Sequence, residues 1–305
     1  MYKTFDEMIA NCGCLAESTV VVAAADRAST EAVKLAFEHG LGRSVLVGDK
    51  ALLEPLAKEF GIEERVTIVD CPEPAEAAKK AVEIIRDGTG DTLMKGLVNS
   101  SDFLHAVLDR EKGLRAGHLL SHLAVLEIPG EKHLSFCTDS GFMVAPTLDQ
   151  KKHILRNALR GIYALGYEHV NVACLAANDK ADPKVPSTMD AAALVEAWRN
   201  GEFDECPCTC TVEGPMAIDV VASKESALHK GIRSVIAGKV DLTLVPNIEC
   251  GNVHCKTLEY YCHAKFAGVV LGAKVPIVLV SRNDTPETKF QAVLLSSLIA
   301  GGTHE

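Results

Sequence analysis

The sequence lacks an excess of positive charge and has no long hydrophobic segment. Its 305 residues include 41 Asp and Glu against 31 Lys and Arg, and no basic cluster stands out. A net charge of -10 repels nucleic acid, so we expect no nucleic-acid partner. No apolar run reaches the roughly 18 residues of a membrane span, and the first residues lack the basic-then-apolar order of a signal peptide. We therefore expect a cytoplasmic protein without a membrane partner.

The common motifs of α/β enzymes are also missing. Two G-x-G pairs lack the third glycine of a dinucleotide fingerprint, and there is neither a complete P-loop nor a G-x-S-x-G nucleophile elbow. His118 and His122 have the i, i+4 spacing of a helix face but lack the glutamate of H-E-x-x-H. The sequence therefore argues against zinc at this pair, and we expect no metal.

The eleven cysteines are odd in number and scattered, which favours reduced thiols over a disulfide framework. The segment ECPCTCTVEGP, which we interpret as a strand, has a cysteine at alternate positions of its first part, namely Cys206, Cys208 and Cys210. Side chains on one strand face are spaced about 7 Å apart, so three sulfurs in a line cannot surround one tetrahedral zinc ion. Buried core sulfur is the favoured interpretation, and a metal site and a reactive thiol remain as alternatives.

Short β-branched runs alternate with longer helical patterns through most of the chain, which predicts parallel βαβ units and a doubly wound sheet. Two consecutive strands without a helix, within 122–130 and 132–141, interrupt the alternation and mark a domain junction. We predict two doubly wound α/β/α domains. The first comprises 1–136 and is closed by 284–305, which contain the last helix, and the second comprises 137–283.

Polar residues and glycines follow several of the predicted strands. In open parallel sheets ligands bind at the carboxyl ends of strands, so these residues are candidates for a binding site. Glycines admit a ligand to the backbone, and Lys and Arg supply charge, which together suit an anion such as phosphate. Any single one of them is also explained as a helix cap or turn, and Arg282 by an ion pair with Glu249 or Asp284. The candidates are Lys95, Asn99, Ser100, Ser101, Asp139, Ser140, Gly141, Glu213, Gly214, Asn247, Glu249, Cys250, Gly251, Asn252, Lys256, Ser281, Arg282 and Asp284.

The ordered set of these segments resembles the phosphate acetyltransferase and phosphate butyryltransferase family, most closely its butyryltransferase branch. The likeness runs from Leu93 to Ala300 through LMKGLVNSS, LSHLAVLEIP, TDSGFMVAP, PSTMDAAAL, VEGPMAID, PNIECGN and VPIVLVSRND. It implies a fold similar to the isocitrate and isopropylmalate dehydrogenases, with a cleft between the domains, and a homodimer. It also implies the reaction of acyl-CoA with phosphate to give acyl phosphate and CoA, with coenzyme A as a substrate and no permanently bound cofactor.

The resemblance also implies roles for individual residues. In the acetyltransferases a Ser-Arg pair follows the last strand, the Arg binding phosphate and the Ser stabilising the transition state, and this pair matches Ser281 and Arg282. Those enzymes place a basic Asp seven residues after the Ser, where this chain has Thr288. The resemblance therefore does not identify a base for this chain. Asp284 is our candidate, and the alternative is that the CoA thiol, which is partly ionised near neutral pH, needs no base. Direct transfer is implied, so Cys250 lines the site rather than acting as nucleophile.

Three alternatives remain open on the sequence. Acyl chain length depends on a pocket volume that the sequence does not show, so an acetyl- or propionyl-preferring enzyme is the first. A decarboxylating NAD-type dehydrogenase of similar fold is the second, although the strand ends lack its cluster of aspartates. A non-catalytic CoA-binding protein is the third.

Overall fold

The computed structural model describes residues 2–280 and 284–302 and divides the chain into two compact units. One unit spans Leu119–Lys265, and the other spans Tyr2–His118 together with the chain from Phe266 onward. These limits lie earlier than the boundaries expected from the sequence, after 136 and 283. The first limit is earlier because β5 (Ser121–Glu127) pairs antiparallel with β6 (Ser135–Thr138) and so groups with the strands that follow it.

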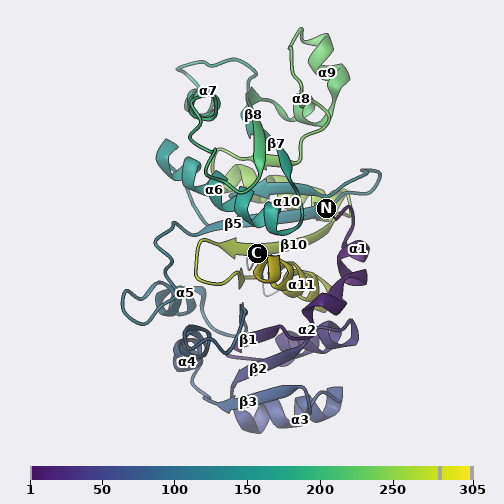
Figure 1. Ribbon diagram of the computed structural model, residues 1–305, viewed down its shortest axis with the longest axis vertical. Coiled ribbons are helices and arrows are strands. Elements are labelled where there is room, and N and C mark those ends of the chain that lie inside the picture. The colour runs from purple at the N-terminus through teal and green to yellow at the C-terminus, as the bar shows by residue number, and fades with distance from the viewer. Residues whose placement is uncertain (1, 281–283, 303–305) are drawn as a thin grey trace. The chain divides into compact units, whose positions relative to one another are not determined.

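The unit that contains Tyr2–His118 has the strand order β3-β2-β1-β4-β11-β10, of which β1, β2, β3 and β10 are labelled in Figure 1. Its first four strands are parallel and alternate with helices along the chain, as the sequence predicted. The strands are β1 (Thr19–Ala23), β2 (Arg43–Gly48), β3 (Val66–Asp70), β4 (Thr92–Lys95), β10 (Lys265–Leu271) and β11 (Ile277–Val278). The helices are α1 (Phe5–Ala10), η1 (Cys12–Leu15), α2 (Arg27–Glu38), α3 (Lys50–Phe60), α4 (Pro74–Arg86), α5 (Ser100–Leu108) and α11 (Pro286–Gly302).

The last helix, α11, belongs to this N-terminal unit and packs against α2. Nearly all of its turns are buried, including Phe290 and the run from Ala292 to Ala300. A helix that is apolar around its circumference needs neighbours on several sides, which explains why the chain returns to this unit at its end.

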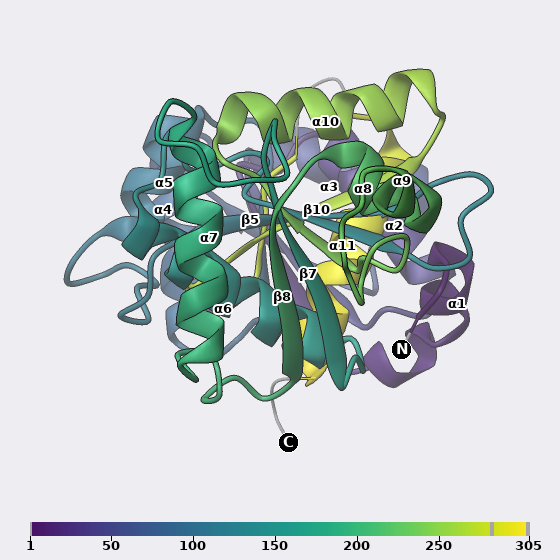
Figure 2. The same ribbon diagram turned by 90° about the horizontal axis from the view of Figure 1, so that it is seen from above.

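The second unit has the strand order β5-β6-β9-β7-β8, in which all strands after β5 run parallel. Figure 2 shows α6 and α7 on one side of β7 and β8, with α8 and α9 on the other. The remaining strands are β7 (His169–Leu175), β8 (Thr209–Met216) and β9 (Leu242–Leu244). The helices are α6 (Leu148–Ala164), α7 (Pro186–Arg199), α8 (Ile218–Ala222), α9 (Lys224–His229) and α10 (Ile248–Tyr261).

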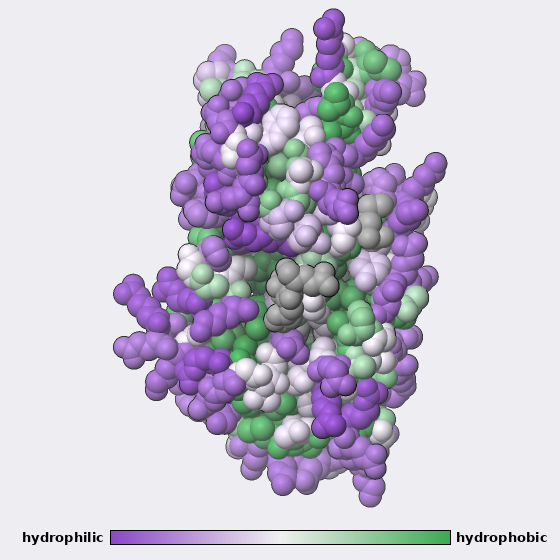
Figure 3. Space-filling view, in the orientation of Figure 1, coloured by the Kyte–Doolittle hydropathy of each residue, from purple (hydrophilic) through white to green (hydrophobic). Residues whose placement is uncertain are grey.

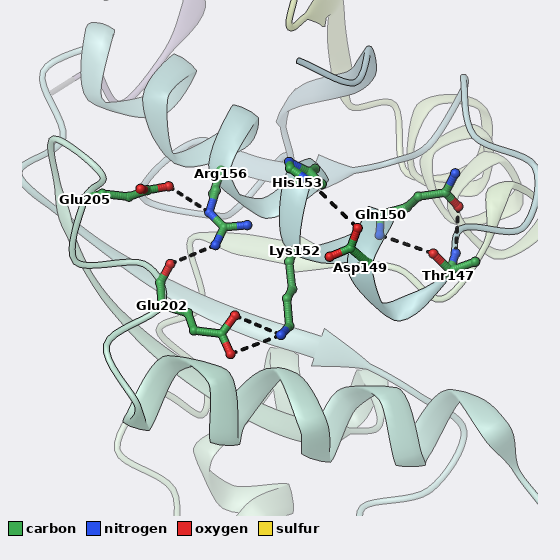
Figure 4. Close-up of polar contacts among 8 residues, drawn as sticks. All are labelled: Thr147, Asp149, Gln150, Lys152, His153, Arg156, Glu202 and Glu205. Carbon is green, nitrogen blue, oxygen red and sulfur yellow. Dashed lines mark hydrogen bonds and ion pairs between the residues drawn. The ribbon is translucent and has the colours of Figure 1, made fainter. Parts of the chain in front are cut away.

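Helix α6 begins with a capping box and holds the segment that precedes the cysteine stretch (Figure 4). The amide oxygen of Gln150 accepts the Thr147 backbone N–H at 2.8 Å, closing the first turn. Further along the helix, Lys152 forms an ion pair with Glu202 at 2.8 Å, and Arg156 forms one with Glu205 at 3.0 Å. These pairs fasten residues 202–205 to α6.

The prediction that Cys206, Cys208 and Cys210 share one strand face is wrong. Strand β8 begins only at Thr209, so Cys206 and Cys208 lie in the preceding turn. Pro207 between them has no N–H to donate to a sheet ladder, which explains the late start. The Cys206 and Cys208 thiols are nevertheless buried, and the Cys208 thiol donates to the Leu159 carbonyl at 3.4 Å. The interpretation as core sulfur is confirmed for these two.

Hydrophilic side chains cover most of the face drawn in Figure 3, and apolar residues form only separate patches on it. Within the described ranges, no helix has the length and hydropathy required to cross a membrane. The same ranges contain no group of three or more His, Cys, Asp or Glu side chains arranged to hold a metal ion.

Candidate active site

The end of β6 and the start of α10 bring together two of the predicted groups of site residues in the second unit. Asp139, Ser140 and Gly141 follow β6, and Asn247 begins α10 after the parallel neighbour β9. The Asn247 side chain accepts the Cys250 backbone N–H at 2.9 Å and so caps the helix. The two connections lie side by side because parallel strands end at the same edge of the sheet.

Asp139 organises the loop that follows β6. Its Oδ1 accepts the backbone N–H groups of Gly141 at 3.0 Å and Phe142 at 2.8 Å, and its Oδ2 accepts that of Met143 at 3.2 Å. Burial raises the pKa of this carboxyl, and the backbone hydrogen bonds work in the opposite direction. A carboxylate occupied in this way shapes the loop, in which Gly141, Val144 and Ala145 are exposed.

Ser140 is buried, and its hydroxyl lies 2.9 Å from Nδ1 of His122 on β5. Burial lowers the pKa of His122 to about 4, so this imidazole is neutral near pH 7. The i, i+4 helix face considered for His118 and His122 does not form, because His122 lies in a strand. Sequence reasoning missed His122 as a neighbour of the site. The available signal was a histidine inside the otherwise apolar run HLAVLEI.

The remaining candidates on α10 differ in exposure. Glu249 and Asn252 are exposed, and Cys250 is partly buried. Lys256 forms an ion pair with Glu259 at 2.8 Å, which offsets part of its charge within the helix. Burial raises the pKa of the Cys250 thiol, and a protonated thiol is a poor nucleophile.

Glu213 and Gly214 lie inside β8, which continues to Met216, whereas the sequence suggested that they end the strand. The Glu213 carboxylate accepts the Val235 backbone N–H at 2.9 Å. A Cβ at Gly214 would lie 2.6 Å from the Cβ of Cys174, so the glycine allows β8 to approach β7 closely. Both residues therefore have structural contacts within this unit.

The other unit contains the candidates from the β4–α5 connection. Lys95 ends β4 and is buried, with Nζ 3.4 Å from the Gly96 carbonyl oxygen. Asn99 is the N-cap residue of α5, which starts with Ser100 and Ser101. The Asp284 carbonyl accepts a hydrogen bond from the Lys289 side chain ahead of α11. The predicted pair Ser281 and Arg282 lies outside the described residues.

Comparison with known proteins finds similar sequences along nearly the whole chain. A family model described as phosphate acetyl/butaryl transferase matches residues 72–297. The chain is 40% identical over 303 residues to the phosphate butyryltransferase of Clostridium acetobutylicum, covering 99% of each protein. It is 38% identical over 281 residues to the phosphate acetyltransferase of Thermotoga maritima, covering 92% of this chain and 94% of that protein.

A solved structure gives the same result. The branched-chain phosphotransacylase of Enterococcus faecalis V583 superposes with a TM-score of 0.82 at 29% identity, covering 93% of this chain and 99% of that one. The predicted α/β fold class and the predicted family resemblance are both confirmed.

Proposed function

Because the chain belongs to the phosphate acetyl/butyryl transferase family, we propose that it exchanges a butyryl group between CoA and inorganic phosphate by direct transfer. The transfer of an acyl group between CoA and phosphate rests on one observation, the 40% identity to a phosphate butyryltransferase along 99% of both chains. Coenzyme A is a substrate of this reaction. We further propose that the enzyme has no permanently bound cofactor and acts as a cytoplasmic homodimer.

The chemistry of direct transfer needs no covalent enzyme intermediate. A phosphate oxygen attacks the thioester carbonyl, the C–O bond forms, the C–S bond breaks, and CoA leaves as a thiolate that takes up a proton. An oxyanion develops on the carbonyl, and donors placed around it stabilise the transition state. We assign phosphate binding to Arg282 and oxyanion stabilisation to Ser281, and we keep Asp284 as the candidate base. The raised pKa of Cys250 favours a lining role for this thiol over an acyl-enzyme.

The other candidates take supporting roles in this proposal. Lys95 with the Asn99, Ser100 and Ser101 turn contributes contacts to phosphate or CoA. Gly141 and the start of α10 border the acyl transfer site, and Asp139 and Ser140 shape that border through the hydrogen bonds described above. The butyryl preference is the finer part of the proposal, because an acetyltransferase relative is 38% identical to this chain.

An acyl-CoA panel in phosphate buffer tests the function. Acetyl-, propionyl-, butyryl- and isobutyryl-CoA are each incubated with the enzyme, and free thiol is measured with and without phosphate. We expect phosphate-dependent thiol release with the highest kcat/KM for butyryl-CoA. If kcat/KM is highest for acetyl- or propionyl-CoA, that acyl group replaces butyryl in the proposal. Binding of CoA without phosphate-dependent thiol release points to the non-catalytic alternative, and reduction of NAD by a 2-hydroxy acid points to the dehydrogenase.

A further inference from the structure

His122 is a buried polar residue in the middle of the apolar strand β5. Its side chain is 7% exposed, and the next four residues of the strand, Leu123 to Leu126, are all buried and apolar. An aliphatic side chain of similar size would fill this space without the cost of desolvating an imidazole. The contribution of the histidine is therefore to be found in its hydrogen bonds.

His122 hydrogen-bonds the residues on both sides of Asp139, one through its backbone carbonyl and one through its ring, and only the ring bond requires a histidine. The carbonyl oxygen of His122 accepts the Thr138 hydroxyl at 2.8 Å, and its Nδ1 lies 2.9 Å from the Ser140 hydroxyl oxygen. The ring also lies beneath Gly141, where an added Cβ would be 3.4 Å from the ring carbon Cγ. The backbone N–H of His122 also hydrogen-bonds the Asp139 carboxylate, so one residue of β5 is in reach of every position from Thr138 to Gly141.

The loop is held from its other side by α10. Gly251 approaches so closely that a Cβ there would lie 2.7 Å from the Ser140 Cα. The Ser140 side chain also hydrogen-bonds Cys255, one turn further along the helix, and lowers the pKa of that thiol together with the larger effect of its hydrogen bond with Cys137. Ser140 thus links the imidazole on β5 to helix α10.

We propose that His122 is a positioning residue for acyl transfer, which acts through Ser140 to fix the Asp139–Met143 loop against the start of α10. This inference rests on the proposed function. The neutral imidazole contacts Ser140 and Gly141, and the loop is the part that borders the substrates. A loop held by hydrogen bonds on one side and by helix packing on the other keeps its geometry when substrates bind.

The test compares two replacements of the same residue. His122→Leu removes the hydrogen bond and keeps apolar bulk, whereas His122→Asn keeps a polar atom at the position of Nδ1. Because a misplaced site loses rate in the bound complex, we expect His122→Leu to lower kcat by roughly 10- to 100-fold with a smaller change in the KM for acyl-CoA. His122→Asn should recover most of that loss, to within about threefold of the wild type, because it keeps a hydrogen-bonding atom for Ser140. Urea unfolding measures the folded fraction of each variant, and activity is expressed per folded molecule.

Ser140→Ala tests the same hydrogen bond from its other end and serves if His122→Leu folds poorly. If His122 acts through Ser140, the double variant His122→Leu/Ser140→Ala loses no more kcat than the larger of the two single losses. Additive losses in this cycle would overturn the proposal, and so would equal kcat values for His122→Asn and His122→Leu. An inactive wild-type protein would overturn the proposed function and this role together, whereas wild-type kcat in the variants of an active enzyme overturns only the role of His122.

Discussion

Gly251, in the first turn of α10, lies directly against the Cα of Ser140 at the end of β6. A Cβ on Gly251 would be 2.7 Å from that Cα, 2.9 Å from Cγ2 of Val245 and 3.0 Å from the Asp139 carbonyl oxygen. Two of these three atoms belong to the backbone and cannot move by a change of rotamer. Helix α10 can therefore lie this close to the loop after β6 only because residue 251 is a glycine, which has no Cβ.

Gly251→Ala is expected to displace α10 from this loop. Alanine favours a helix by about 1 kcal/mol, but overpacking costs about 1–3 kcal/mol, so we expect a net loss of stability. We also expect kcat/KM to fall by about tenfold or more, because the two displaced segments border the proposed acyl transfer site. Urea unfolding and steady-state kinetics with butyryl-CoA measure the two effects.

Gly13→Ala is the matched control, because a Cβ at Gly13 meets no atom within 4 Å. This variant should keep the wild-type kcat/KM. If Gly251→Ala behaves like Gly13→Ala in both measurements, the close approach of α10 does not matter for the site.

The second prediction concerns acid stability. Burial lowers the pKa of His122 to about 4, below the value of 6.5 for a histidine in water, so the unfolded chain binds this proton more readily than the folded protein. The free energy of unfolding should therefore decrease as the pH falls from about 6.5 to about 4, by about 3 kcal/mol from this residue alone.

Urea unfolding of the wild type and His122→Asn at pH 7.5, 6.0 and 5.0 isolates this contribution. Other histidines whose pKa is lowered by partial burial, such as His254, contribute equally to both proteins. The wild type should lose stability more steeply on acidification than the variant. Parallel pH dependences in the two proteins would show that the imidazole takes up its proton without a cost to folding.

The fold could be predicted from the sequence because its signals are local. Apolar runs such as TVVVA in β1 are followed by capping residues such as Asp26, whose side chain accepts the Ser29 backbone N–H at 3.0 Å. This alternation alone predicts parallel strands and covering helices. The groups Asp139–Gly141 and Asn247–Gly251 could be predicted as neighbours for the same reason, since both follow strands of a parallel sheet.

The details that could not be predicted depend on partners far away in the chain. His122 meets Ser140 because β5 and β6 pair antiparallel, and the two consecutive strands predicted here do not by themselves give the register of that pairing. Glu213 looks like a strand end before a glycine and proline, but β8 continues past it because β7 supplies a partner up to Met216. Strand β8 begins later than the alternating cysteines predict, because Pro207 has no N–H group for a sheet ladder.

The third prediction concerns Cys208, which precedes β8, and Cys210, which lies in it. Burial raises the pKa of the Cys208 thiol to about 11 and that of Cys210 to about 12, so both are protonated at neutral pH. Iodoacetamide reacts with thiolates, and the native protein should be alkylated first at the exposed Cys14 and Cys262. Peptide mass spectrometry after brief labelling at pH 7.5 identifies the modified sites, and labelling in urea provides the control for complete reaction. Early modification of Cys208 or Cys210 would restore the reactive-thiol interpretation of this stretch.

The last prediction tests the residue on which the proposed mechanism depends most. Arg282 is assigned to phosphate, and a guanidinium binds an oxyanion with two parallel N–H donors. Arg282→Ala should raise the KM for phosphate and lower kcat by about 10²-fold or more, because a charge that stabilises the transferring group is lost. Arg282→Lys should recover part of the phosphate affinity but not the full rate, since an ammonium lacks the planar pair of donors.

Arg199→Ala is the control, because Arg199 pairs with Glu196 on the surface of α7 and its loss should leave both constants unchanged. Wild-type kinetics in Arg282→Ala would remove Arg282 from the mechanism and move the search for the phosphate site to Lys95 and the start of α5.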